Sequence, residues 1–239
     1  IRRNEFKLFG ILNGIDVDAY NPATDKAIFS NYSADNIGPK ARCKEELQKM
    51  FNLPVKPNTP VIAIISRLVA HKGLDLVRTV IEEVLRQDVQ VIILGKGDSS
   101  YENYFSDLAR HYVGKMVTVI AFNPDLSRKI YSGADLFLMP SKSEPCGLSQ
   151  MIASRYGTVP IVRETGGLYD SIKPVGNGGN GFTFADYNAY DMLYVIREAI
   201  NCYYNKEFWP ELVKRVMSVD FSWQRSAKDY EKVYGEMLK

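Results

Sequence analysis

The sequence has few of the residues that build disulfide frameworks or metal centres. Its 239 residues include three cysteines, an odd number at wide spacing: Cys43, Cys146 and Cys202. This usage suits a reducing compartment and argues against a disulfide framework. The two histidines, His71 and His111, have no neighbouring pattern of cysteines or carboxylates, so we expect no metal site.

Long apolar runs and a strong charge of either sign are also missing. No run approaches the ~20 apolar residues that a membrane-spanning helix needs. The net charge of +2 is too small to favour nucleic acid or a membrane surface as the main partner. Residues 1–5 lack an initiator methionine and do not resemble a signal peptide, so we expect a piece of a longer polypeptide.

The sequence does contain a regular alternation of short apolar runs and segments of helical period. Its length fits one large domain over residues 1–239. Apolar residues at the spacing of one helix face predict helices over 73–87 and 190–204. Asn123 and Pro124, as a cap and first turn, predict another helix that ends near Gly133. The alternation predicts an α/β fold with a Rossmann-like, doubly wound parallel sheet. The strands are predicted at 8–12, 61–65, 89–94, 117–121, 136–139, 159–162 and 181–184.

The segment 222–239 is predicted to form a terminal helix. Ser222 is a favourable N-cap, and Trp223, Tyr230 and Tyr234 fall on one apolar stripe of the helix that follows. That stripe needs a partner surface.

Two segments at the carboxyl ends of predicted strands carry the clearest indication of a ligand. One is 140–150 (PSKSEPCGLSQ), which includes Glu144, and the other is 164–168 (ETGGL). In an open α/β sheet ligands bind at this edge, and glycine turns bring backbone N–H groups close to a phosphate. A lone glutamate, or a tight strand–helix turn, is more often without a ligand.

A loop with two cations follows the strand predicted at 61–65. Arg67 and Lys72 could stabilise the negative charge that builds up on a diphosphate leaving group. Two basic residues in one surface loop are usually only solvated. The turn 95–97 (GKG) lacks the third glycine of a dinucleotide fingerprint and is predicted to be a turn only.

In combination these segments resemble the glycogen/starch synthase family. The resemblance is carried in order by 13–25 (NGIDVDAYNPATD), 66–73 (SRLVAHKG), 140–150 and 165–168 (TGGL). It covers essentially the whole chain. It implies the C-terminal half of a two-domain GT-B glycosyltransferase, with 222–239 returning toward an N-terminal domain that this chain lacks.

By this resemblance three residues have catalytic roles. Arg67 and Lys72 match the family's basic pair on the donor diphosphate, and Glu144 matches the carboxylate set against the donor glucose. Gly166 and Gly167 match the loop and helix start that line the phosphates and the glucose. The resemblance implies no cofactor and no metal, since ADP-glucose is the donor substrate.

Further substrate-binding residues follow from the same resemblance. Cys146, Gly147 and Leu148 match the loop that contacts the sugar, and Thr165 belongs to the glycine turn. Phe122 falls where the family usually has an aromatic residue against the adenine ring.

The implied function is transfer of glucose from ADP-glucose to the non-reducing end of an α-1,4-glucan, with retention at the anomeric carbon. Ile152 stands where the wider GT-B pattern has a second glutamate, eight positions after Glu144, and this favours ADP-glucose over UDP-glucose. The alternatives are a UDP-glucose-dependent GT-B transferase and a non-catalytic nucleotide- or glucan-binding module.

The resemblance also sets expectations for the chain alone. The family's Lys-Thr-Gly-Gly loop belongs to the other domain, so we expect weak binding of ADP or ADP-glucose and no elongation of glucan. The full-length enzyme would engage the glucan acceptor, with no nucleic acid and no membrane as partner. The expected location is the bacterial cytoplasm, or the plastid for a plant protein.

Overall fold

A six-stranded parallel sheet forms the centre of the molecule. The structure is a computed structural model that describes residues 8–238. The strands run in the order β3-β2-β1-β4-β5-β6, and every neighbouring pair is parallel. Almost all strand residues are buried or half-buried, since helices cover both faces of the sheet. The strands are β1 Val61–Ile65, β2 Gln90–Gly95, β3 Met116–Ile120, β4 Leu136–Met139, β5 Val159–Arg163 and β6 Phe182–Phe184.

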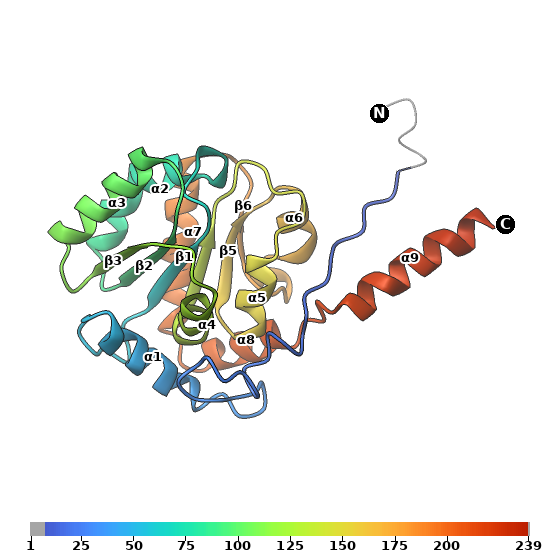
Figure 1. Ribbon diagram of the computed structural model, residues 1–239, viewed down its shortest axis with the longest axis horizontal. Coiled ribbons are helices and arrows are strands. Elements are labelled where there is room, and N and C mark those ends of the chain that lie inside the picture. The colour runs from blue at the N-terminus through green and yellow to red at the C-terminus, as the bar shows by residue number, and fades with distance from the viewer. Residues whose placement is uncertain (1–7, 239) are drawn as a thin grey trace.

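Helices pack on both faces of this sheet. In Figure 1, α4 and α5 lie in front of it, and α2 and α7, which pack on each other, lie behind. None of the helices within residues 8–238 has both the length and the apolar content needed to cross a bilayer. The helices are α1 Lys40–Met50, α2 Leu74–Leu85, α3 Ser99–His111, α4 Pro124–Gly133, α5 Ser149–Arg155, α6 Gly167–Ser171, α7 Ala189–Tyr203, α8 Phe208–Met217 and α9 Trp223–Met237, with short 3-10 turns at Ala70–Lys72 and Val175–Asn177.

The predicted doubly wound sheet is confirmed, with β1 to β6 within one residue of the predicted strand bounds. The strand predicted at 8–12 is wrong. These residues run outside the sheet and pair with no strand, so Leu8 and Phe9 are each 57% exposed. An apolar run becomes a strand only where a sheet edge is available to pair with it.

Side-chain caps mark the starts of α4 and α9. The Asn123 side chain accepts a hydrogen bond from Leu126 N at 3.0 Å, and Pro124 occupies the first turn of α4. Ser222 caps α9 in the same way through Arg225 N at 3.3 Å. Both predicted helix starts are therefore confirmed.

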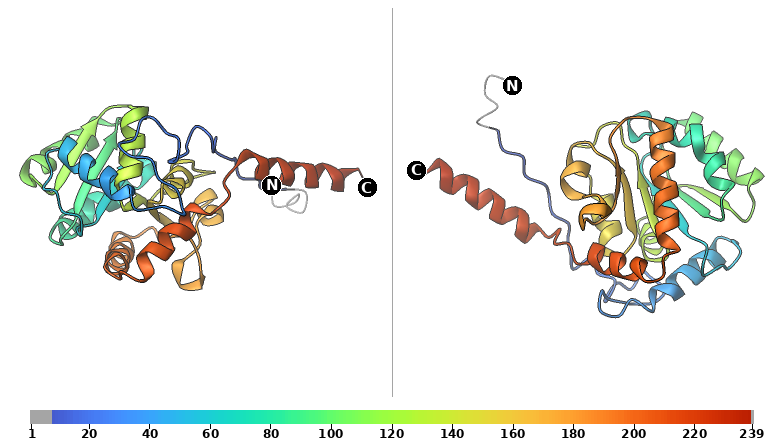
Figure 2. Two further views of the ribbon diagram at one scale, coloured as in Figure 1. Left: turned by 90° about the horizontal axis from the view of Figure 1, so that it is seen from below. Right: turned by 180° about the vertical axis from the view of Figure 1, so that it is seen from behind.

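The segments 12–15 and 221–226 meet at one side of the sheet domain. Ile15 N donates to Phe221 O at 2.8 Å, and Ser226 Oγ donates to Leu12 O at 2.7 Å. Beyond this junction α9 extends away from the body (Figures 1 and 2). Its stripe remains open, with Tyr234 60% exposed.

Candidate functional site

The strand order places the predicted site residues in one row along the carboxyl edge of the sheet. Phe122 follows β3, Arg67 follows β1, Glu144 follows β4 and Gly166 follows β5. In the sheet these strands lie in the same sequence, from β3 to β5. The change of direction in strand order falls between β1 and β4, the position where doubly wound sheets bind ligands.

Lys72 and Glu144 form an ion pair at the centre of this row. Lys72 Nζ lies 2.5 Å from Glu144 Oε2, and the two side chains are only 16% and 10% exposed. Ser141 Oγ donates to the same carboxylate oxygen at 3.3 Å. The loops meet because Gly73 has a φ of 74° and lies against the backbone, where a Cβ would come 1.9 Å from the carbonyl oxygen of Pro140.

Backbone and arginine hydrogen bonds fix the loop that carries Glu144. Lys142 N donates to His71 O at 2.9 Å, which joins the loop after β4 to the loop after β1. Arg163, at the end of β5, donates to Ser141 O at 3.0 Å and to Lys142 O at 2.6 Å. The carboxylate therefore stands on a loop that is held from both neighbouring strands.

The glycine turn after β5 packs directly on the same loop. Gly167 N donates to Glu144 O at 3.0 Å, and Thr165 N donates to Arg163 O at 2.9 Å. Gly166 is exposed and Thr165 half-buried. Unlike the N–H groups of Thr165 and Gly167, the N–H of Gly166 has no acceptor among the described residues. The turn thus shapes the loop around Glu144 in addition to presenting a donor.

Arg67 and Phe122 lie at a separate hollow of about 360 Å³ at the ends of β1, β2 and β3. Its volume is within the range of small-molecule sites. None of the described residues that line it carries a carboxylate, whereas Arg67 and Lys96 carry positive charges. Phe122 is 90% exposed at the rim. The hollow is lined by Tyr20, Ile65, Ser66, Arg67, Leu94, Gly95, Lys96, Ala121, Phe122, Asn123, Pro124, Ser127, Tyr131, Ser149 and Ile152.

Ile152 and Tyr131 form an apolar part of this wall. Ile152 is 8% exposed and Tyr131 3% exposed. Burial raises the pKa of the Tyr131 phenol above its ordinary value of 10.0, so the ring is neutral at physiological pH. At the position of the second GT-B glutamate the hollow therefore presents a hydrocarbon surface.

The remaining predicted residues lie between the ion pair and the hollow. Cys146 and Gly147 are half-buried and Leu148 is 45% exposed, in the loop that leads into α5. Ser149, which follows this loop, lines the hollow. The structure thus brings all the predicted site residues to one edge of the sheet, in two adjoining groups.

Sequence reasoning missed three residues of this edge. Lys96 directly follows β2, in a segment that we predicted to be a turn only, yet it lines the hollow. Tyr20 reaches the same hollow from the irregular segment after Asn13, where its ring lies 5.1 Å from the Arg128 guanidinium. Arg163 is a basic residue at a strand end, the same signal that pointed to Arg67.

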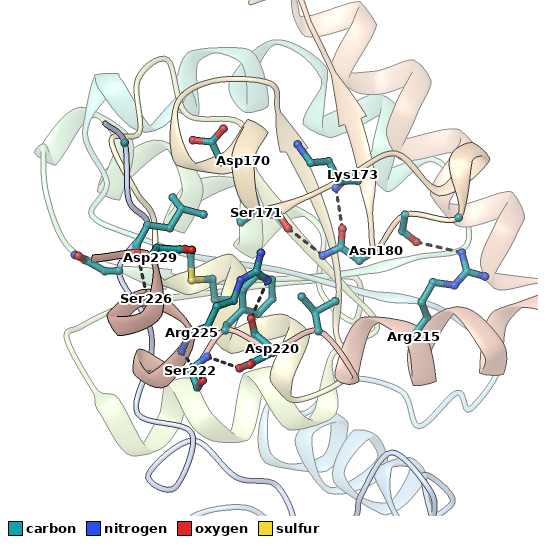
Figure 3. A pocket seen from close by; sticks show the side chains of 18 residues that line it. Asp170, Ser171, Lys173, Asn180, Arg215, Asp220, Ser222, Arg225, Ser226 and Asp229 are labelled. Carbon is teal, nitrogen blue, oxygen red and sulfur yellow. Dashed lines mark hydrogen bonds between the residues drawn. The ribbon is translucent and has the colours of Figure 1, made fainter. Parts of the chain in front are cut away.

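A larger hollow of about 670 Å³ lies away from this edge (Figure 3). It is bounded by α6, the loop 173–181 and the junction with α9. Several of its polar groups bond to one another: Asn180 bonds to Lys173 N at 2.7 Å and Ser171 O at 3.0 Å, and Arg225 to Asp220 O at 3.2 Å. None of the predicted site residues lines it, so we assign it no ligand.

Comparisons with known proteins identify the family of the chain. The chain matches the family model "Glycosyl transferases group 1" over residues 45–211. Over its whole length it is 49% identical to a glycogen synthase of Bacillus cereus and 50% identical to a glycogen synthase of Clostridium acetobutylicum. It covers 51% of each, so the chain spans about half the length of the curated relatives it matches.

Solved structures show the same fold. The catalytic domain of starch synthase IV from Arabidopsis thaliana, bound to ADP and acarbose, superposes with a TM-score of 0.91 at 36% identity, over 98% of this chain and 50% of that one. Sucrose-phosphate synthase from Thermosynechococcus elongatus superposes with a TM-score of 0.65 at 17% identity, over 95% and 52% of the two chains. The second likeness concerns the fold alone.

Proposed function

The chain belongs to the group 1 glycosyl transferases, and on that premise we propose that it is the nucleotide-sugar-binding domain of a glycogen or starch synthase. The proposed reaction transfers glucose from ADP-glucose to the non-reducing end of an α-1,4-glucan, with retention. The names of the relatives support this reaction, as does the ADP in the starch synthase IV structure.

The observation that carries the proposal is the Lys72–Glu144 pair beside a cationic hollow that is free of lining carboxylates. A nucleoside diphosphate sugar has three parts: an aromatic base, an anionic diphosphate and a sugar. The hollow with Phe122 suits the base and ribose, Arg67 and Lys72 suit the diphosphate, and Glu144 suits the sugar. The order of these residues along the sheet edge matches the order of the parts.

In the proposed reaction the bond between the anomeric carbon and the β-phosphate oxygen breaks. The acceptor hydroxyl oxygen bonds to that carbon on the same face, and its proton passes to the departing ADP. Arg67 and Lys72 stabilise the negative charge on ADP. We assign Glu144 to positioning the donor and stabilising positive charge on the sugar, not to nucleophilic attack, since Lys72 and Ser141 already engage one of its oxygens.

We further propose that the chain alone binds donor and does not transfer glucose. The acceptor and the other side of the glucose would be held by a second domain, and closure of two domains excludes water from the donor. The open stripe on α9 is consistent with a surface that packs on such a domain. The bacterial relatives favour the bacterial cytoplasm as the setting.

Isothermal titration calorimetry of the chain with ADP, UDP and a maltooligosaccharide tests the proposal. We expect ADP to bind more tightly than UDP, and Arg67→Ala and Lys72→Ala each to weaken ADP binding by roughly tenfold or more. Arg197→Ala, which removes an exposed cation that pairs with Glu83 on the outer helices, is the matched control and should leave binding unchanged.

Three outcomes would contradict the proposal. Tighter binding of UDP would indicate a UDP-glucose transferase. Binding of maltooligosaccharide that is indifferent to both site variants would indicate a glucan-binding module. Glucose incorporation into glycogen by the chain alone would refute the need for a second domain.

A further inference from the structure

Gln150 is a fully buried amide at the start of α5, directly behind the loop that precedes it. Its Nε2 donates to Cys146 O at 3.2 Å, to Gly147 O at 2.9 Å and to Ser171 Oγ at 3.1 Å. Ser171 Oγ in turn donates to Gly167 O at 2.6 Å. One side chain therefore joins the loop after β4 to α6.

The acceptor atom of this amide has no partner in the described part of the chain. Gln150 Oε1 is buried and unpaired among the described residues. Turning the amide over would not help, because its oxygen would then face two carbonyl oxygens and its nitrogen would lose all three acceptors. A buried unpaired acceptor costs free energy, so the donor half of the amide must supply something that an apolar side chain would not.

What the donor half supplies is the orientation of the loop backbone. With the carbonyl groups of Cys146 and Gly147 turned inward to Gln150, the N–H groups of Cys146, Gly147 and Leu148 donate to no acceptor among residues 8–238. Gly147 has a φ of 73°, and Leu148 lies in the right-handed region at φ −113° and ψ −30°. Such an alternation turns successive N–H groups toward a common side.

Gly147 and Gln150 also fit each other sterically. A Cβ on residue 147 would lie 2.5 Å from Gln150 Oε1 and 2.9 Å from its Nε2. The loop can take this path only with glycine at position 147, so the conformation of the loop depends on both residues together.

We propose that Gln150 is a positioning residue for the donor sugar, which rests on the function proposed above. By holding two carbonyl groups inward, it leaves the N–H groups of Cys146, Gly147 and Leu148 free to donate to the hydroxyl oxygens of the glucose. The nucleotide hollow is lined by Ser149 and Ile152 of the same helix, but not by Gln150. Gln150 therefore acts on the sugar part of the donor and not on the nucleotide part.

Titration calorimetry with ADP and with ADP-glucose separates these parts. Gln150→Met keeps the length of the side chain and removes the donor. We expect it to raise the Kd for ADP-glucose by about tenfold, the loss of one or two hydrogen bonds, while the Kd for ADP changes less than about twofold. Ser154→Ala is the matched control: it removes a buried hydroxyl of the same helix, whose bond to Gln150 O at 2.8 Å does not reach the loop.

Gln150→Glu is the second variant and guards against misfolding of the first. Its ionised carboxylate would repel both carbonyl groups, whereas its protonated form can donate to one of them. The Kd of Gln150→Glu for ADP-glucose should therefore move back toward that of the unaltered chain as the pH is lowered and the carboxyl is protonated. A role in packing alone would not produce this pH dependence.

The outcomes are distinguishable. An unchanged ratio of the two Kd values in Gln150→Met, or an equal loss for ADP and ADP-glucose, would overturn the role of Gln150 and leave the proposed function intact. Absence of ADP binding by the unaltered chain would refute the proposed function itself, and this inference with it.

Discussion

Replacing Glu144 by glutamine should tighten ADP binding, although the same change should abolish glucose transfer in the full-length enzyme. The Lys72 ammonium lies 2.5 Å from Glu144 Oε2 in the structure. A phosphate oxygen bonded to the opposite side of that ammonium at ~2.8 Å would lie about 5 Å from the carboxylate oxygen. Two unit charges at this separation repel by roughly 0.8 kcal/mol in water and roughly 3 kcal/mol at an effective dielectric constant of 20.

Glutamine removes this repulsion but also weakens the contact that holds Lys72 in place. The amide oxygen that replaces the carboxylate can still accept from Lys72, so the loss from this nearly buried contact is about 1 kcal/mol. We therefore expect a net gain of about 1 kcal/mol, or a Kd for ADP about fivefold lower. The gain should shrink at high salt, because screening weakens both terms.

Calorimetry of Glu144→Gln with ADP at low and high salt measures this effect. Glu83→Gln, which removes a half-buried carboxylate that pairs with Arg197, is the control and should change nothing. A Kd that rises threefold or more in Glu144→Gln would refute the reasoning. It would mean that the carboxylate serves ADP binding mainly by fixing Lys72.

Three further changes test the fold beneath the site. Gly73→Ala should lower the free energy of unfolding by about 2 kcal/mol or more, because Gly73 has a positive φ and lies against the carbonyl group of Pro140. Gly176→Ala is the control, since a Cβ there would meet no atom within 4 Å, and urea denaturation compares the two variants. Lys40→Met should cost about 3 kcal/mol in the same assay, because the buried ammonium donates to Ser132 O at 2.8 Å and Tyr156 O at 3.0 Å; equal stability would contradict this. Burial raises the pKa of the Tyr131 and Tyr156 phenols above 10.0. Their contribution to the free energy of unfolding is therefore complete below pH 10.0 and is lost as the pH rises above that value, by ~1.4 kcal/mol per phenol per pH unit. Urea denaturation at alkaline pH, followed by phenolate absorbance, checks that stability falls with pH.

The sheet was predictable because each strand is signalled by its own residues. Short apolar runs such as 136–139 are buried on both faces, and a local cap such as Asn123 marks a helix start. The run 8–12 carries the same signal and fails, since pairing depends on a free sheet edge that only the whole fold determines. The common position of Arg67, Glu144 and Gly166 at one edge was predictable because a parallel sheet brings the ends of its strands together, whereas their roles rest on the family resemblance.

The contacts within the site were not predictable in this way, because they depend on how two loops approach each other. Lys72 and Glu144 are 72 positions apart, and their ion pair requires the path that Gly73 allows against the loop after β4. Lys96 follows β2 in a segment without a motif and reaches the hollow only because β2 lies beside β1. The sequence gives no signal that sets Gln150 apart from other polar residues in short helices, because its role depends on the contact between its amide and the loop that precedes α5. A site on several loops is therefore specified by backbone contacts between residues far apart in the sequence. Gly73 and Gln150 build those contacts without touching the donor, so substitutions at either residue should alter donor binding.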